Sequence, residues 1–352
     1  MKTIKLYYDQ KPTNFGDTLS FFIADKLYGS VHHAHMGQCE AVFIGSLIGR
    51  FLTKKKFLQR LPSLLRIPVK IWGSGYVEIN DRKNMELLRR LDVRACRGFL
   101  TLERLKKLRY AKIAKNVAIG DPGLLASRII DTSRVEKKYA LGIIPHYVDK
   151  DNPLLQKIAV KNATIIDIQQ EPEAFMNQLA ECEHVIASAM HAMVAADSLG
   201  IPNARMIASD KILGGDYKYD DDYSAFGLTA HTKIDLRQRG FMESDLANLK
   251  MEYKITPEKV QKIQDALLAA FPYPRQELLL TDPPQTGYTG HPVQKDSFTE
   301  GRNYTTLGIT CFGKPITILS TETSSFFGRK RDSLWAFSFA SVCLPFYPCL
   351  YF

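Results

Sequence analysis

The stretch HVIASAMHAMVAADSLGIP, residues 184–202, decides which fold the chain can adopt. Its opening run, residues 184–187, is short and β-branched in the middle, which predicts a buried strand. Ser188 is a residue type that caps helices, and apolar groups then recur at helical spacing until Gly200 and Pro202 stop them. We therefore expect a strand, a tight turn and a helix.

Such a turn is a common ligand site. In an open α/β sheet, ligands bind at the carboxyl ends of the strands, where a helix amino terminus offers unpaired N–H groups to an anion. His191 falls in the first turn of the predicted helix, so we expect its imidazole in the same crevice. Taken alone, the pattern also fits an ordinary helix residue with Ser188 only as a cap, because few such junctions bind a ligand.

Length and charge limit the number of domains and the kind of partner that we expect. With 352 residues the chain exceeds the usual size of one domain, so we expect two. A net charge of +10 and a pI near 9.2 indicate anionic partners. The basic residues concentrate in residues 50–70 and 104–115. Aromatic side chains that could stack on bases are few in these stretches, so we do not expect nucleic-acid binding.

Several features predict a cytoplasmic protein. The six cysteines form no CxxC pair, which fits a reducing compartment. The amino terminus lacks the apolar core of a signal peptide, and the first 330 residues contain no eighteen-residue apolar span. The segment from Arg50 to Lys70 mixes lysine and arginine with leucine and phenylalanine. It is either a solvated amphipathic helix or a peripheral contact with anionic lipid at the inner face of a membrane.

Strand-to-helix turns with small residues recur in the first half. Residues 3–8 read as a strand, and a helix follows NFGD at residues 14–17. Asn14 and Asp17 can cap that helix, and Gly16 lets the backbone approach a ligand. A second strand, residues 69–75, ends in Ser74 and Gly75. The GxGxxG and GxxxxGK[ST] fingerprints of dinucleotide and P-loop sites are absent from these turns.

Arg97 ends the next predicted strand, residues 91–97, at its turn into a helix. A guanidinium there can hold a carboxylate or phosphate with a fork of donors, or it can form a surface salt bridge. Asp121 and Pro122 set the turn that closes this half of the chain.

A polar stretch at residues 131–138 separates a second set of alternating strands and helices. We expect an α/β protein with two Rossmann-like domains, residues 1–135 and 136–272, facing across a cleft in a GT-B-like arrangement. Residues 252–271 read as a helix capped by Thr256. The tail, residues 273–352, is rich in Thr, Ser, Pro and aromatics, and we expect it to be irregular and outside the working fold.

Eight pieces of sequence occur together in one order: NFGD, WGSG, CRG, GDPG, GIIPH, IID, SAMHAMVAADSLGIP and KYDDDYSAFG. Together they resemble the polysaccharide pyruvyltransferase family, most closely its succinoglycan-type branch. The resemblance covers residues 3–235. It implies transfer of the enolpyruvyl group of phosphoenolpyruvate to a sugar as a cyclic ketal. Many relatives carry an arginine two positions before the motif histidine, where this chain has Ala189.

The chemistry of this transfer gives individual residues expected roles. We expect His191 to be the general acid or the proton donor to the phosphate, Asp17 or Asp167 to accept the hydroxyl proton, and Arg97 to hold the carboxylate or phosphate of the donor. His146 is a second candidate for the acid. The other residues expected to bind substrate are Asn14, Gly16, Ser74, Gly75, Ser188, Lys211 and Lys218.

The proposed chemistry needs no metal or cofactor, with phosphoenolpyruvate as co-substrate and a glycan as acceptor. That glycan would be polyprenyl-linked if the segment from Arg50 to Lys70 lies near the cleft. His32, His33 and His35 form a loop cluster without acidic partners at ligand spacing, so we do not expect a metal site there. Two alternatives stay open: a GT-B glycosyltransferase that uses a nucleotide sugar, and a non-catalytic remnant. Lys218 with the aspartates at 220–222 would serve the first.

Overall fold

The computed structural model describes residues 2–10, 15–78 and 85–276, together with the backbone of residues 306–311 and 314–319. The chain divides into two compact units, Met1–Tyr288 and Thr289–Phe352. In the second unit, β16 (Thr306–Cys311) pairs with β17 (Lys314–Leu319) as an antiparallel hairpin. Most of the tail that the sequence predicts to be irregular lies outside the described residues, as does Asn14.

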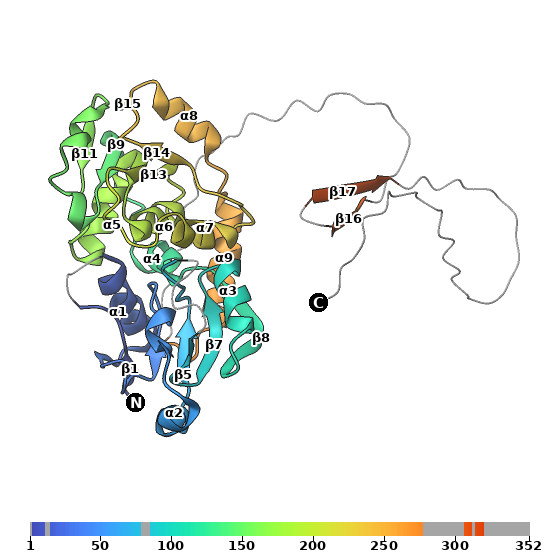
Figure 1. Ribbon diagram of the computed structural model, residues 1–352. Coiled ribbons are helices and arrows are strands. Elements are labelled where there is room, and N and C mark those ends of the chain that lie inside the picture. The colour runs from blue at the N-terminus through green and yellow to red at the C-terminus, as the bar shows by residue number, and fades with distance from the viewer. Residues whose placement is uncertain (1, 11–14, 79–84, 277–305, 312–313, 320–352) are drawn as a thin grey trace, which may run out of the picture. The chain divides into compact units, whose positions relative to one another are not determined.

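The first half of the larger unit is a parallel sheet of six strands (Figure 1). In spatial order the strands are β2 (Val31–His33), β1 (Ile4–Leu6), β3 (Ala41–Val42), β5 (Val69–Trp72), β7 (Leu91–Cys96) and β8 (Ala111–Ile119). The other elements of this half are α1 (Phe15–Tyr28), η1 (Ile48–Phe51), α2 (Phe57–Leu64), α3 (Phe99–Lys106), η2 (Pro122–Leu125), α4 (Ala126–Ile129) and the antiparallel pair β4 (Leu52–Thr53) and β6 (Glu86–Leu87). Ile4, Leu6, Ile71 and Val93 are almost completely buried, as expected for strands covered on both faces.

The second half is a parallel sheet of five strands. In spatial order these are β11 (Ala163–Ile165), β9 (Tyr139–Ile144), β12 (Cys182–Ala187), β13 (Asn203–Ile207) and β14 (Lys233–Asp235). The other elements are η3 (Tyr147–Asp149), η4 (Pro153–Lys157), α5 (Pro172–Ala180), α6 (Met190–Ser198), α7 (Tyr217–Ser224), α8 (Asp245–Glu252) and the parallel pair β10 (Ile158–Ala159) and β15 (Phe241–Met242). Two parallel sheets with crossover helices confirm the predicted α/β class with two Rossmann-like halves.

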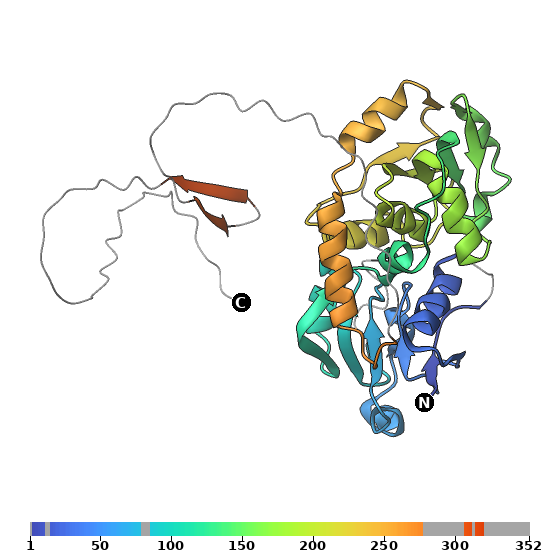
Figure 2. The same cartoon turned by 180° about the vertical axis from the view of Figure 1, so that it is seen from behind.

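The last helix of the larger unit links the halves. Thr256 caps α9 (Pro257–Ala269), as predicted, by accepting from the backbone of Lys259 at 3.4 Å. The helix then runs back along the first half (Figure 2), where the indole of Trp72 donates to the carbonyl of Leu267 at 3.0 Å. Residues that follow the second sheet in sequence therefore complete the core of the first.

Residues 184–202 fold as the end of β12, a tight turn and α6, with Gly200 at φ +67° after the helix. The cap prediction for Ser188 is wrong. Ala189 occupies the N-cap position without a side-chain cap, because the Ser188 hydroxyl accepts instead from the backbone N–H of His146 at 2.7 Å. Ser188 thus fixes the ends of β9 and β12 relative to each other.

His32 and His33, which the sequence suggested as part of a loop, lie in the edge strand β2, where pairing with β1 overrides the polar composition. Lys218 and the aspartates at 220–222 lie in α7. Across the described residues, none of the helices has both the length and the apolar character needed to cross a bilayer.

Candidate active site

A cavity of about 330 Å³ lies where the two halves meet. Each half contributes seven lining residues: Asp9, Asp17, Gly45, Ser46, Leu47, Arg50 and Val77 from the first, and His146, Tyr147, Ala189, Met190, His191, Leu213 and Lys218 from the second. Most of them follow the carboxyl ends of β1, β3, β5, β9, β12 and β13. The cavity is therefore at the position where parallel sheets bind ligands.

His191 projects from the first turn of α6 toward the turn before η2. Its Nε2 lies 3.6 Å from Oδ2 of Asp121, whose other oxygen accepts from the backbone N–H of Gly123 at 2.8 Å. A separation of 3.6 Å is too long for a hydrogen bond. Neither facing atom has a hydrogen-bond partner among the described residues, although both are buried. The Nε2 atom of His191 thus faces a buried carboxylate at ion-pair distance, and no hydrogen bond to another described residue competes for either atom.

Gly16 sets the position of the His191 ring. A Cβ atom on Gly16 would lie 1.9 Å from Nδ1 of His191, so only glycine fits there. The amino end of α1, from the first half, therefore packs directly against the imidazole from the second half. The role predicted for Gly16, a close backbone approach to a ligand, is replaced by a close approach to a protein side chain.

Asp17, the next residue of α1, lines the cavity. Burial raises its pKa to about 7, although the neighbouring His191 acts to lower it. At neutral pH this carboxyl therefore exchanges a proton readily, which suits a group that acts as acid or base.

Lys218 is the cation of the second half that faces the cavity. Burial lowers its pKa to about 7, and the charges of Arg97 and Arg205 act in the same direction. Its ammonium group forms no ion pair with any residue that the structure describes. His146 lies nearby, and burial followed by repulsion from Lys218 lowers the pKa of His146 to about 4. A bound anion would offset this concentration of positive charge.

Arg50, at the carboxyl side of η1, brings a guanidinium to the wall of the cavity from the first half. It is half exposed and donates to Asp9 at 2.9 Å, and Asp9 also accepts from the hydroxyl of Tyr7 at 3.0 Å. Because the pair is open to solvent, an anionic ligand can compete for the guanidinium.

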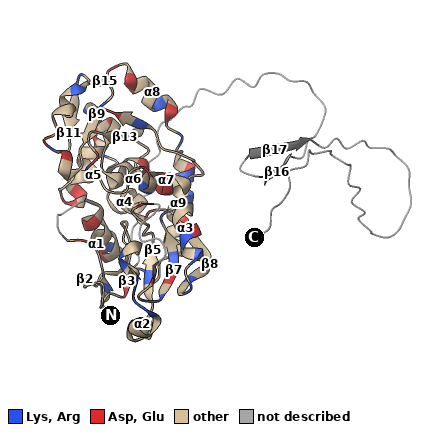
Figure 3. Cartoon of the chain, viewed as in Figure 1, with Lys and Arg blue, Asp and Glu red and all other residues tan. Residues whose placement is uncertain are grey.

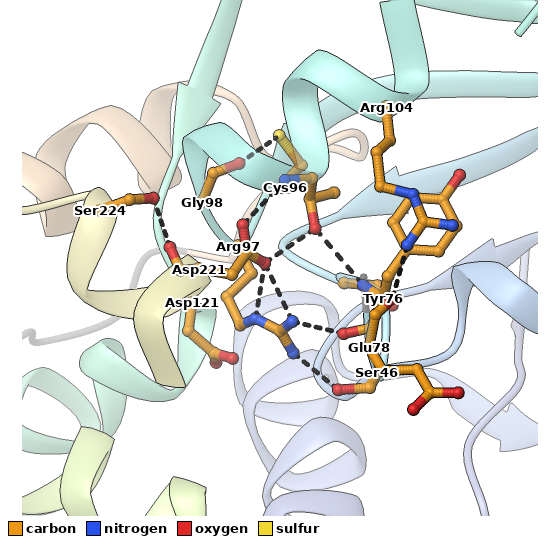
Figure 4. A network of polar contacts seen from close by, with 12 residues as sticks. Ser46, Tyr76, Glu78, Cys96, Arg97, Gly98, Arg104, Asp121, Asp221 and Ser224 are labelled. Atoms are coloured by element: carbon orange, nitrogen blue, oxygen red, sulfur yellow. Dashed lines mark hydrogen bonds and ion pairs between the residues drawn. The ribbon is translucent and has the colours of Figure 1, made fainter. Parts of the chain in front are cut away.

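Arg97 lies behind the cavity wall and has no exposed surface. Its Nε and Nη2 contact Oδ2 of Asp221 at 2.9 Å (Figure 4). Nη2 also donates to the carbonyl of Tyr76 at 2.6 Å, and Nη1 donates to the hydroxyl of Ser46 at 2.7 Å. All three nitrogens are thus paired within the protein. The structure does not bring Arg97 into the cavity, where the sequence had suggested it.

The reason is that the protein supplies its own anion at this strand-to-helix turn. Oδ1 of Asp221, from α7, accepts from the backbone N–H of Thr101 at 2.8 Å, and the hydroxyl of Ser224 accepts from Phe99 at 2.8 Å. These contacts cap α3, whose N-cap residue is Gly98. They also fix α7 against the first half, which sets the position of Lys218 one turn earlier.

The other predicted residues stand apart from the cavity. Ser74 is buried and donates to the carbonyl of Gly45 at 2.7 Å, so it shapes the cavity wall from behind. A Cβ atom on Gly75 would lie 2.5 Å from the Arg97 guanidinium, so Gly75 makes room for that side chain. Asp167 is an exposed turn residue paired with Lys150 at 2.6 Å. Lys211 is exposed and does not line the cavity.

Sequence reasoning missed three groups that the fold brings to the site. Asp121 belongs to the GDPG piece, which predicts a turn. Nothing in the local sequence indicates that its Oδ2 faces His191. Asp9 and Arg50 lie in no motif, and only the arrangement of β1, β3 and η1 places them together. Among the described residues, no group of three His, Cys, Asp or Glu side chains is arranged to hold a metal ion.

Comparisons with known proteins show the family to which the chain belongs. The chain is 28% identical over 232 residues to an uncharacterized protein of Acanthamoeba polyphaga mimivirus, covering 64% of this chain and 76% of that protein. A crystal structure of a functionally uncharacterized protein from Klebsiella pneumoniae shares 16% identity at a TM-score of 0.36, covering 63% of this chain and 87% of the other. The family model for polysaccharide pyruvyl transferase matches residues 2–210, which is more than half of the chain. The chain therefore belongs to the polysaccharide pyruvyl transferase family and is a transferase.

Proposed function

We propose that this transferase moves the pyruvyl group of phosphoenolpyruvate onto two hydroxyls of one sugar, forming a cyclic ketal and releasing phosphate. The observation that carries the proposal is that His191, Asp17 and Lys218 line one cavity. These groups provide two proton-exchanging side chains and a cation. That set matches a small donor bearing a phosphate and a carboxylate.

Binding of the donor rests on charge. Lys218 and Arg50 approach the cavity from opposite halves, and α6 begins at Met190 with backbone N–H groups that have no partner inside the helix. Ala189 lines the cavity where many relatives carry arginine. In this chain Arg50 or Lys218 therefore takes the anion that such an arginine would hold, and the alanine supports assignment to the succinoglycan-type branch.

The chemistry requires a proton at the methylene carbon of the donor. Protonation makes the carbon that bears the phosphate electrophilic, and the first sugar hydroxyl adds to it while losing its proton. The second hydroxyl then displaces phosphate and closes the ring. Of the two hydroxyl protons, one replaces the proton given to the methylene carbon and the other leaves with the phosphate, so no other reagent is consumed. We assign the acid role to His191, whose Nε2 faces Oδ2 of Asp121 at 3.6 Å, and the base role to Asp17.

The acceptor has a place beside the donor. A second cavity of about 350 Å³ shares Ser46, Arg50, Val77 and Leu213 with the first and adds Gly49, Glu78 and Gly214. We propose that it binds the acceptor sugar, whose hydroxyls would donate hydrogen bonds to the Glu78 carboxylate. The acceptor would be a repeat unit of an exopolysaccharide or capsule. The free buried cysteines Cys39, Cys96 and Cys182 support a reducing, cytoplasmic setting.

The glycosyltransferase alternative was suggested by the aspartates at 220–222, and none of these lines the cavity. Asp221 pairs with Arg97, Asp220 pairs with His231 at 2.7 Å, and Asp222 is buried, so the acidic run serves the interior. The volume of the donor cavity also lies near the lower limit of the roughly 300–1,000 Å³ that ligand pockets occupy. A small donor suits it better than a nucleotide sugar.

Two measurements test the proposal. Phosphoenolpyruvate should raise the melting temperature of the full chain, whereas a uridine-diphosphate sugar should not. Phosphate release from phosphoenolpyruvate in the presence of an acceptor glycan should fall at least about 100-fold in His191→Gln and Lys218→Met. The control Lys211→Met, an exposed lysine outside the cavity, should keep the parent rate. Stabilisation by the nucleotide sugar alone, or full activity of His191→Gln, would contradict the assignment.

A further inference from the structure

The segment from Lys54 to Ile67, which contains α2, presents apolar side chains to solvent. Of the eleven large apolar side chains that are exposed among the described residues, five lie here. They are Phe57, Leu58, Leu61, Leu65 and Ile67, with Leu58 79% and Leu65 73% exposed. Such a cluster on one short segment marks an interaction site, whereas single exposed leucines do not.

The orientation of α2 is the reverse of what burial alone would favour. Arg60, its one charged residue, is 5% exposed and donates to the carbonyl of Leu87 at 2.8 Å, with Glu86 at 3.4 Å. Leu64, four residues later, is also buried. The polar contact therefore turns the helix so that Phe57, Leu58, Leu61 and Leu65 share the outward face. An outward apolar face held in place by a buried arginine is typical of an interaction surface.

The charge around this face identifies the partner. Three consecutive lysines, Lys54, Lys55 and Lys56, lead into the helix and are exposed, and Arg66 follows it. Figure 3 shows blue stretches of ribbon, which mark Lys and Arg, next to α2. We propose that the segment from Lys54 to Ile67 docks onto a membrane surface that carries anionic lipids. The leucines and Phe57 would enter the boundary between headgroups and acyl chains, while the lysines contact the headgroup phosphates.

The same observations disfavour a second copy of the chain as the occupant. Two such faces placed together would bring their lysine clusters close to each other, which costs electrostatic energy. One helix of eight residues with its flanks is also a small surface compared with the roughly 1,200–2,000 Å² that a stable dimer buries.

The docking segment is narrower than residues 50–70, which the sequence suggested. Arg50 faces the cavity, and Lys70 lies in β5 with its ammonium 4.8 Å from the ring centre of Tyr273. Since α2 precedes β5, it lies at the amino end of the first sheet, the edge opposite the cavity (Figure 1). Docking would therefore leave the cavity open, and it does not depend on the proposed reaction.

Cosedimentation of the full chain with vesicles tests the proposal. Binding should occur with phosphatidylcholine vesicles in which about a third of the lipid is phosphatidylglycerol, and it should weaken as salt is added. Replacing Lys54, Lys55 and Lys56 by Gln should lower the partition coefficient about 100-fold, since each lysine near such a surface contributes about fivefold. Leu58→Glu with Leu65→Glu should abolish binding.

Matched controls separate the local surface from overall charge and hydrophobicity. Replacing the exposed Lys107, Lys112 and Lys115 by Gln makes the same charge change elsewhere, and Met251→Glu places a glutamate at a side chain that is 65% exposed on α8. Both controls should bind like the parent. Milder Leu58→Gln and Leu65→Gln variants, with melting temperatures checked, keep the test valid if the glutamates unfold the chain.

Failure to bind anionic vesicles would overturn the proposal, and so would equal losses in the controls. A dimer in solution that Leu58→Glu converts to monomers would show that the face is a contact between copies instead.

Discussion

Gly16→Ala tests whether catalysis depends on the position that the His191 ring occupies in the structure. The added methyl group would lie 1.9 Å from Nδ1 of His191 and 2.5 Å from its neighbouring ring carbons, whereas ordinary contact begins near 3.4 Å. The ring must therefore move by about 1.5 Å, which separates its Nε2 from Asp121 and from the cavity.

A displacement of about 1 Å in a catalytic group costs on the order of 100-fold in rate. We expect kcat for phosphate release to fall by about that factor in Gly16→Ala. Folding responds differently, because alanine is favoured over glycine in a helix by about 0.5–1 kcal/mol. In a His191→Ala background the obstacle is gone, so the same substitution should stabilise the chain by up to that amount and change the residual rate little.

The assay is a double-mutant cycle over the parent, the two single variants and the double variant. Steady-state phosphate release and urea unfolding are both measured. Gly37→Ala is the control, because a Cβ atom there meets nothing within 4 Å. A parent-like rate in Gly16→Ala, or rate losses that multiply in the double variant, would refute the idea that this glycine acts through His191.

Four further predictions follow from the site. Asp121→Asn should keep the bond to Gly123 but lower kcat about 100-fold, with little change in the Kd for phosphoenolpyruvate by titration calorimetry. Arg97→Met should lower the free energy of unfolding in urea by about 3–5 kcal/mol, because Asp221 would remain as an unpaired buried charge; unchanged stability with lost donor binding would restore Arg97 as a ligand. The folded chain holds a proton on Asp17 that the unfolded chain releases, so stability is lost as pH rises from the ordinary pKa of 3.8 to about 7. Asp17→Asn should reduce this loss when unfolding is compared at about pH 5 and about pH 8, and an unchanged difference would contradict the raised pKa. Glu78→Gln should raise the acceptor KM and leave the Kd of phosphoenolpyruvate unchanged, and a changed Kd would argue against a separate acceptor cavity.

The sequence alone was informative where local pattern and backbone chemistry dominate. The alternation of buried strands with amphipathic helices predicted two parallel sheets, and the run from β12 into α6 placed His191 in the first turn of its helix. Thr256 predicted the cap of α9. These features depend on neighbouring residues, so periodicity and capping preferences suffice to find them.

Only the tertiary structure decided which polar groups share the cavity. Asp121, Asp9 and Arg50 reach His191 and Lys218 through strand order, which no local pattern encodes. The guanidinium of Arg97 is suited to binding an anion, but it pairs with Asp221, 124 residues away in the sequence, and the pair is buried. The sequence gives the type of each side chain, whereas its partner depends on long-range packing. The partner determines whether a charged group is free to bind substrate or stabilises the fold.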